Sequence, residues 1–382
     1  MCMLRSLYDS EHNAFRLSVR AFCEKQIAPF HAEWEEAGLV DRSLWLEAGK
    51  QGLLGMDVDE QYGGGGVKDF RYNCVVAEEV TRVGGSGVGF TLHNDVVAPY
   101  LNDLCTDEQK SRWLPSFVTG ETITAIAMSE PGAGSDLQGL KTTARRDGTD
   151  WVISGSKTFI TNGIHADLVL VVARTDADAG AHGFSLLAVE RGMTGFERGR
   201  NLDKVGMKAQ DTAELFFDDV RVPAENLIGK EGGGFVHLMT ALPQERLSIA
   251  VVAVAASRLV LDRTVAYCKE RKAFGKPIGS FQHNRFVLAE METEVCIAEQ
   301  YLDRAVLEHN AGRFDVKDAA MAKWWTTELQ KRVVDQCVQL HGGYGYMLEY
   351  PVAKAFVDSR VQTIYGGTTE IMKEIIGRSM GV

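Results

Sequence analysis

The chain has 382 residues, of which 45% are hydrophobic and 24% are charged. These fractions are typical of soluble proteins that fold into two or three domains, and they exclude a disordered or fibrous chain. The 52 Asp and Glu residues outnumber the 41 Lys and Arg residues, which gives a formal net charge of −11. Because nucleic-acid-binding surfaces carry a basic face, this charge argues against DNA or RNA as a partner.

The spacing of apolar residues changes along the chain. Up to about residue 120 it follows the helical period, as in 14–28 and 72–83. From about 121 to 228 the period is two, which predicts short strands. The predicted strands are 122–128, 151–160, 168–173, 184–189 and 213–217. The dipeptide Asp147-Gly148 is typical of a hairpin turn between strands.

From about residue 229 onward the helical period returns over long stretches. The predicted helices are 243–272, 282–310 and 317–340. We therefore predict an all-β module between two helical ones. The expected domains are an N-terminal α-helical domain (1–120), a middle β domain (121–228) and a C-terminal α-helical domain (229–382).

Targeting and metal-binding signals are weak. The first thirty residues include Asp9, Glu11 and Glu24, and they contain neither a signal-peptide apolar region nor an acid-poor transit segment. The apolar runs are far shorter than the roughly 20 residues that span a bilayer. We expect a cytoplasmic, bacterial protein without membrane insertion. The nine histidines are dispersed, and we predict no metal site.

Four segments combine small, polar and aromatic residues in patterns suited to a flat or anionic ligand. Residues 126–136 run from a strand into a Pro/Gly turn, and 157–163 end a strand beside an aromatic residue. In residues 271–277, basic side chains lie where a long helix ends. They suit either of two roles: binding a phosphate, or a favourable interaction with the helix dipole. The fourth segment comprises the glycine- and tyrosine-rich stretches 339–346 and 365–370.

In order and spacing, these segments resemble the acyl-CoA dehydrogenase family over essentially the whole chain. Most of that family places its catalytic carboxylate directly after the tyrosine of the last segment, where this chain has Gly366. Long-chain members resemble this chain instead, with a glycine there and the glutamate in a Pro-Gln-Glu-Arg stretch at the start of a long helix. That glutamate is Glu245 here. Isovaleryl-CoA dehydrogenases also carry the base on that helix, but Phe159 and residues 321–325 look closer to the long-chain type.

The resemblance implies a fold and an activity. The expected fold is mainly α with a central β domain: an N-terminal helical domain, a middle β-barrel or sandwich, and a C-terminal four-helix bundle. The implied reaction is FAD-dependent oxidation of a saturated acyl-CoA to the trans-2-enoyl-CoA, with electron-transfer flavoprotein as acceptor. Glu245 would remove the α-proton, while the Gly366 N–H and a flavin ribityl hydroxyl would bind the thioester oxygen. The implied assembly is a homotetramer.

The resemblance also assigns binding roles, position by position. The implied flavin-ring contacts are Ile126, Met128, Ser129, Phe159, Ile160, Thr161, Thr368 and Glu370. The implied contacts to the pyrophosphate and adenine end, typically across a subunit interface, are Arg271, Phe274, Gln282, Gln339, Gly342 and Gly343. The implied substrate contacts are Ser135, Pro243, Arg246, Tyr365 and Gly367.

Other functions stay open at this point. Glu245 by itself would fit a first-turn glutamate that the helix dipole favours. The same scaffold hosts branched short-chain dehydrogenases of the isovaleryl type, and flavin oxidases that pass electrons to oxygen. A catalytically inactive relative that only binds acyl-CoA is a further alternative. Chain length and branching of the acyl group cannot be read from these motifs.

Overall fold

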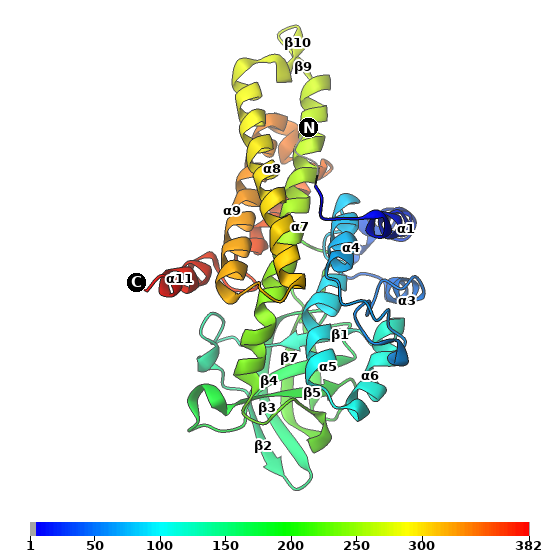
Figure 1. Cartoon of the computed structure of the whole chain (residues 1–382), viewed down its shortest axis with the longest axis vertical. Coiled ribbons are helices and arrows are strands. Elements are labelled where there is room, and N and C mark those ends of the chain that lie inside the picture. The colour runs from blue at the N-terminus through cyan, green and yellow to red at the C-terminus, as the bar shows by residue number, and fades with distance from the viewer. Residues whose placement is uncertain (1–4, 382) are drawn as a thin grey trace.

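The structure is a computed structural model that describes residues 5–381. Figure 1 shows an elongated molecule with a bundle of long helices at one end and a sheet at the other, while the N-terminal helices flank the junction. This arrangement agrees with the predicted fold of helices, sheet and helices. The domain boundaries at residues 120 and 228 stay a prediction.

Six α-helices and a π-helical turn form the N-terminal part of the described chain. They are α1 (Ser10–Gln26), α2 (His31–Ala37), α3 (Ser43–Lys50), α4 (Arg71–Arg82), the π-helix (Leu92–Val97), α5 (Ala98–Leu104) and α6 (Asp107–Thr119). The two helices predicted here are confirmed as α1 and α4. α1 begins earlier than its apolar period suggests, because the Asp9 side chain accepts hydrogen bonds from the backbone of Glu11 and His12 and so caps the helix.

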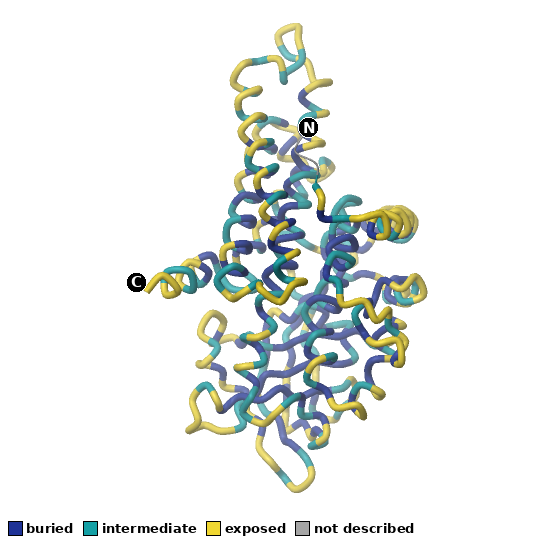
Figure 2. Tube along the Cα trace, viewed as in Figure 1, coloured by how far each residue is buried: buried dark blue, intermediate teal, exposed yellow. Residues whose placement is uncertain are grey.

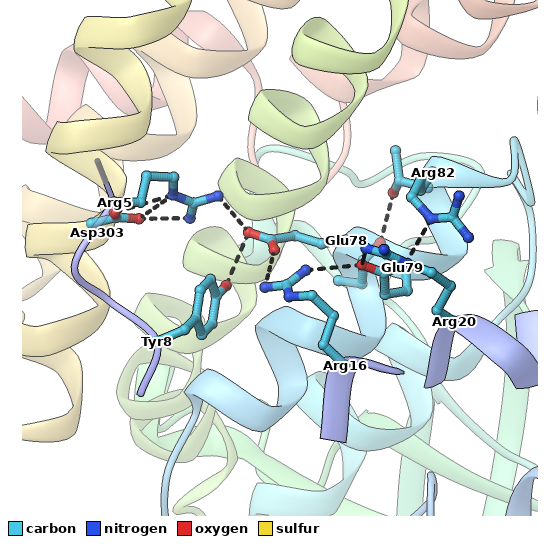
Figure 3. A network of polar contacts seen from close by, with 10 residues as sticks. Arg5, Tyr8, Arg16, Arg20, Glu78, Glu79, Arg82 and Asp303 are labelled. Atoms are coloured by element: carbon cyan, nitrogen blue, oxygen red, sulfur yellow. Dashed lines mark hydrogen bonds and ion pairs between the residues drawn. The ribbon is translucent and has the colours of Figure 1, made fainter. Parts of the chain in front are cut away.

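A polar network holds the N-terminal segment and α1 against α4 (Figure 3). Glu78 binds Arg5 at 2.9 Å, and the adjacent Glu79 binds Arg16 at 3.0 Å. Arg5 also reaches Asp303 of the C-terminal bundle at 2.6 Å. Burial would raise the pKa of Glu79, but hydrogen bonds from several arginines hold it below its usual value. The network therefore ties the first residues to both helical regions.

The middle part of the chain forms one eight-stranded sheet. Its strands are β1 (Thr124–Ala127), β2 (Thr143–Asp147), β3 (Asp150–Thr161), β4 (Leu168–Arg174), β5 (Phe184–Glu190), β6 (Phe196–Asn201), β7 (Thr212–Pro223) and β8 (Leu227–Ile228). The order is β6-β7-β3-β2-β4-β5-β8, with β1 parallel to β4. All five predicted strands are confirmed, although β7 runs six residues further than expected.

The expectations missed β2, β6 and the two-residue β8. β2 and β6 are rich in arginine and other polar residues, so their alternation of apolar and polar positions is weak. The turn at Gly148 does join a hairpin, but its strands are β2 and β3, whereas β1 pairs with β4. The sheet is buried on both faces: alternate residues of β4 contribute to two separate hydrophobic clusters. This double burial explains the nearly continuous apolar runs of β4 and β5.

Long helices form the C-terminal part. They are α7 (Gly234–Glu270), α8 (Gln282–Asn310), α9 (Val316–His341), α10 (Pro351–Ser359) and α11 (Thr369–Ser379), with a short hairpin, β9 (Lys272–Ala273) and β10 (Lys276–Pro277), between α7 and α8. Among the described helices, none is long and apolar enough to cross a membrane. Figure 2 shows buried positions along the bundle interior and exposed ones at the β9–β10 tip.

α7 begins nine residues before its predicted start at Pro243, which lies inside the helix. A proline in a helix interior removes one backbone hydrogen bond and costs about 3 kcal/mol. Packing on both sides offsets this cost: Leu238 belongs to the hydrophobic cluster under the sheet, and Leu247 to the core of the bundle. α7 therefore links the two cores, and Glu245 lies between them.

Candidate active site

Glu245 lies in the interior of α7, about three turns after Gly234, and only 6% of it is exposed. The interpretation as a first-turn glutamate is therefore wrong, and the Pro-Gln-Glu-Arg stretch does not start the helix. The Tyr100 hydroxyl donates a hydrogen bond to Glu245 Oε1 at 3.0 Å. Burial raises the pKa of the Glu245 carboxyl to about 7, against the opposing effects of this hydrogen bond and of the Arg246 charge. A carboxyl group in this state is suited to accept a proton near neutral pH.

Two buried cations face the glycine pair 366–367. Arg246 Nε donates to the Gly366 carbonyl at 3.3 Å, and Lys323 Nζ donates to the Gly367 carbonyl at 2.6 Å. Burial, together with the nearby Arg246 charge, lowers the pKa of Lys323 to about 8. Arg246 Nη1 is buried without a hydrogen-bond partner in the described chain. The site thus combines a buried carboxyl with two cationic side chains that bind the backbone carbonyls of Gly366 and Gly367.

The glycines at 366 and 367 are required by the backbone and by space. Both have positive φ, 63° and 100° respectively. A Cβ at Gly366 would lie 2.4 Å from Ile249 Cδ1, and one at Gly367 would lie 2.5 Å from Met372 Cε. Tyr365, next to them, is half-buried and donates its hydroxyl to Gln362 at 2.8 Å. A carboxylate at position 366 would need Ile249 to move.

The sheet contributes an exposed aromatic ring. Phe159 lies where β3 shifts register against β7, has a φ of 60°, and is 70% exposed. A non-glycine residue at positive φ is strained, and such strain gathers at functional sites. The backbone N–H of Thr158 donates to the Ser129 carbonyl at 3.0 Å, so the first two predicted segments lie side by side. The bulge turns the ring of Phe159 out of the sheet.

Five other residues predicted to contact the flavin ring lie on β1, on β3 and in the turn after β1. Ile126 and Ile160 are buried, whereas Met128, Ser129 and Thr161 are half-buried. Ile126 and Met128 pack in the same hydrophobic cluster as Leu238 and Met239 of α7. The sheet segments and the helix that carries Glu245 are therefore brought together within one chain.

A buried ion pair supports this wall from inside. Lys157 is fully buried, and its Nζ contacts Glu130 Oε1 at 2.9 Å and the Met128 carbonyl at 3.0 Å. Burial lowers the pKa of Lys157 to about 8, although Glu130 opposes the shift. Because breaking a buried pair leaves an uncompensated charge, the pair fixes the end of β1 firmly.

Thr368 and Glu370 lie at the N-terminus of α11. The Thr368 hydroxyl accepts a hydrogen bond from the backbone of Ile371 and caps the helix. Glu370 is exposed, and backbone contacts in this first turn lower the pKa of its carboxyl. Of the implied substrate contacts, Ser135 is exposed in the turn after β1, and Pro243 is half-buried in α7.

The second group of predicted cofactor residues lies elsewhere. They line a hollow of about 750 Å³ between the end of α7, the β9–β10 hairpin and the end of α9. The predicted residues in its lining are Arg271, Phe274, Gln339, Gly342 and Gly343. Gln282 is exposed at the start of α8 but is not part of the lining.

This hollow is far from Glu245. The 25 residues of α7 between Glu245 and Glu270 span about 38 Å at 1.5 Å per residue, and Figure 1 shows the hairpin at the tip of the bundle. One chain therefore does not bring the two groups of predicted cofactor residues together.

Sequence reasoning missed the side chains that bind Glu245 and the glycine pair. Tyr100 lies in no predicted motif, and residues 321–325 were compared with long-chain relatives without a role for Lys323. The role of a buried tyrosine, lysine or aspartate can be assigned only when its hydrogen-bond partner is known. For metals, no three potential His, Cys, Asp or Glu ligands gather anywhere in residues 5–381.

Family models match three consecutive stretches of the chain. Residues 9–121 match the N-terminal, 125–220 the middle and 232–381 the C-terminal domain of acyl-CoA dehydrogenases. The chain belongs to the acyl-CoA dehydrogenase family. It is therefore an oxidoreductase, and the resemblance inferred from the motifs is confirmed.

Individual relatives show which members of the acyl-CoA dehydrogenase family this chain resembles. The long-chain specific acyl-CoA dehydrogenase of Rattus norvegicus mitochondria is 52% identical over 99% of this chain and 88% of its own length. The mitochondrial isovaleryl-CoA dehydrogenase of Solanum tuberosum is 37% identical over 98% of this chain and 91% of its own. The crystal structure of an acyl-CoA dehydrogenase from Geobacillus kaustophilus superimposes with a TM-score of 0.97 and 51% identity, covering 99% of this chain and all of that one. This acyl-CoA dehydrogenase thus has the fold of its family throughout.

Proposed function

We propose that this enzyme oxidises long-chain saturated acyl-CoA thioesters to trans-2-enoyl-CoA, using FAD, with Glu245 as the base. The observation that carries the proposal is the buried Glu245 carboxyl, with its pKa raised by burial to about 7, on the helix whose next residue, Arg246, donates to the Gly366 carbonyl. Position 366 has no side chain to serve as base. The 52% identity to a long-chain specific relative, against 37% to an isovaleryl-CoA dehydrogenase, supports the long-chain type over the branched one.

The reaction needs an α-proton removed and the resulting negative charge stabilised. A thioester α-proton is too weakly acidic for a carboxylate in water, so donors must face the carbonyl oxygen where charge develops. We assign this role to the Gly366 N–H. Arg246 and Lys323 bind the neighbouring carbonyls and bring positive charge to the same turn, which favours an enolate-like transition state. Glu245 then holds the proton.

FAD, when bound, supplies the acceptor for the hydride that leaves Cβ. The chain's residues fit such a group: the exposed, strained Phe159 offers a flat apolar face, and the hollow at the tip presents Arg271 beside small glycines. A glutaryl-CoA dehydrogenase from Mycobacterium smegmatis with the same fold, TM-score 0.91 and 28% identity, was solved in complex with FADH2. Because the two groups of residues are far apart in one chain, we further propose that FAD is shared between subunits of a homotetramer.

We propose electron-transfer flavoprotein as the electron acceptor. A chain with 35% identity and a TM-score of 0.92 comes from a structure of the electron-transferring flavoprotein of Acidaminococcus fermentans. An oxidase would instead produce peroxide, and an inactive relative would not need an intact Glu245. The cytoplasmic location stays a prediction, since the Rattus norvegicus relative is mitochondrial.

A substrate panel tests the function directly. Acyl-CoA substrates from four to eighteen carbons, with isovaleryl-CoA alongside, would be mixed anaerobically with the purified enzyme, and bleaching of the flavin would be followed. We expect reduction to be fastest with long straight chains, and dye reduction in air without peroxide. Preference for isovaleryl-CoA would contradict the long-chain assignment, and stoichiometric peroxide would identify an oxidase.

A further inference from the structure

The Glu245 carboxyl is held by a segment to which no motif gives a role. The π-helix runs directly into α5, which carries Tyr100. Tyr100 is 1% exposed, and its hydroxyl is 3.0 Å from Glu245 Oε1. Within residues 5–381, Oε2 of the same carboxyl makes no hydrogen bond and is not fully enclosed. The two oxygens are therefore distinct: one is anchored, and the other is free to take a proton.

Contacts on either side of Glu245 fix this geometry. Gln244 Nε2 donates to the Asp95 carbonyl at 2.8 Å. One turn later, Ser248 Oγ donates to Asp95 Oδ2 at 2.5 Å. α7 is thus tied to the π-helix before and after Glu245, so the distance between Tyr100 and Glu245 is set by three hydrogen bonds.

The π-helix explains how Asp95 and Tyr100 both reach α7. In a uniform α-helix, residues five apart are rotated by about 140° from one another, because each step turns by about 100°. The wider turn of a π-helix reduces this separation, and such turns are frequent at functional sites. Asp95 lies inside the π-helix and Tyr100 just beyond it.

We propose that Tyr100 is a positioning residue for proton abstraction, an inference that rests on the proposed function. A hydroxyl donor binds a carboxylate more strongly than a neutral carboxyl group, so Tyr100 keeps more of the base deprotonated. It also anchors Oε1, which leaves Oε2 to face the substrate. Tyr100 does not touch the reacting atoms but acts through Glu245.

Other charged groups near Glu245 come from three elements. Arg246 is its neighbour on α7 and favours the carboxylate form. Lys323 of α9 lies beyond Arg246 at the Gly367 carbonyl, and Asp95 of the π-helix lies one turn away at Ser248. Burial raises the pKa of Asp95 to about 7 and lowers that of Lys323 to about 8, so both groups titrate in the same pH range as Glu245. Tyr100→Phe leaves all three groups in place, so the difference between the variant and wild-type pH profiles isolates the effect of the hydroxyl.

Tyr100→Phe in the FAD-loaded enzyme tests the proposal. The rate of flavin reduction by a saturating acyl-CoA would be measured from about pH 5.5 to pH 9. Loss of the donor should move the midpoint of the pH profile up by about one unit, while the rate at high pH stays within a few-fold of the wild-type rate. Tyr62→Phe makes the same change in the same hydrophobic cluster and should leave the midpoint unchanged. An unchanged or lowered midpoint in Tyr100→Phe would overturn the proposal.

A second measurement separates this inference from the proposed function. If no acyl-CoA reduces the wild-type flavin, the proposed function fails, but the coupling between Tyr100 and Glu245 is still measurable. A double-mutant cycle of Tyr100→Phe and Glu245→Gln in the stability of the holoenzyme should give a coupling that is larger at pH 8.5 than at pH 5.5. Absence of coupling at pH 8.5 would show that the hydroxyl does not act on the carboxylate.

Discussion

The surroundings of Glu245 and the hollow at the β9–β10 tip contrast strongly. Glu245 is buried and hydrogen-bonded, and its neighbour Arg246 binds a backbone carbonyl of the same chain. At the tip, Arg271 is exposed and Phe274 is 95% exposed. The first region is complete within one chain, whereas the second presents its polar and aromatic groups outward. A catalytic group must be held in a desolvated environment before the reaction begins. A residue that only binds a ligand can stay exposed until the ligand or another subunit covers it.

Replacing Glu245, the proposed base, should give the largest effect; a small effect would show that the buried region is not the reacting one. Glu245→Gln keeps the size of the side chain and its hydrogen bond from Tyr100 but cannot accept a proton. Flavin reduction by acyl-CoA should slow by about 10²–10⁴-fold, the usual contribution of general-base catalysis. Stopped-flow bleaching measures this, with the exposed Glu36→Gln as a matched control. A near wild-type rate would show that another residue, such as Glu370, is the base.

The pH dependence of the wild-type enzyme should give the next largest effect. Glu245 must be deprotonated to act, and burial raises its pKa to about 7. The rate should therefore fall about tenfold per unit below pH 7 and level off above it. The same rapid-reaction measurement across pH checks this. A midpoint near 4.5 would mean that the carboxyl is hydrated and that the two regions differ less than their burial indicates.

Charge reversal at the tip should weaken cofactor retention without altering the base. Arg271→Glu would place a carboxylate beside the proposed FAD phosphates and remove a charged hydrogen bond. The loss of such a bond costs about 1.5–3 kcal/mol, which corresponds to about a 10- to 100-fold higher dissociation constant for FAD. Flavin content after dialysis measures this, and Lys272→Glu on the neighbouring exposed residue is the control. Equal retention in both variants would show that the hollow does not hold the cofactor.

The smallest expected effect concerns the glycine turn. Gly366→Ala keeps the backbone N–H but adds a Cβ at positive φ, 2.4 Å from Ile249 Cδ1. We expect a loss of about 1–2 kcal/mol in stability from the backbone strain, and Ile249→Ala should relieve only the steric part. Thermal unfolding of the single and double variants separates the two contributions. A full recovery in the double variant would show that the turn is not strained.

Much of the molecule could be predicted from its residues. Apolar residues, alternating in some strands and nearly continuous in β1, β4 and β5, located five of the strands, and the order of the four segments identified the family. β2 and β6 were missed because their polar composition hides the alternation. The start of α7 was misplaced because proline normally begins helices, and nothing local reveals that Leu238 is held under the sheet.

The sequence by itself determined which groups are available: a glycine at 366 and a glutamate at 245, the residue that we propose as the base. Only the tertiary structure decided that this glutamate is buried against Tyr100, and that Arg246 and Lys323 converge on the glycine turn. Tyr100 and Glu245 are 145 residues apart. A pKa depends on burial and on neighbours in space, and no local pattern along the chain encodes either.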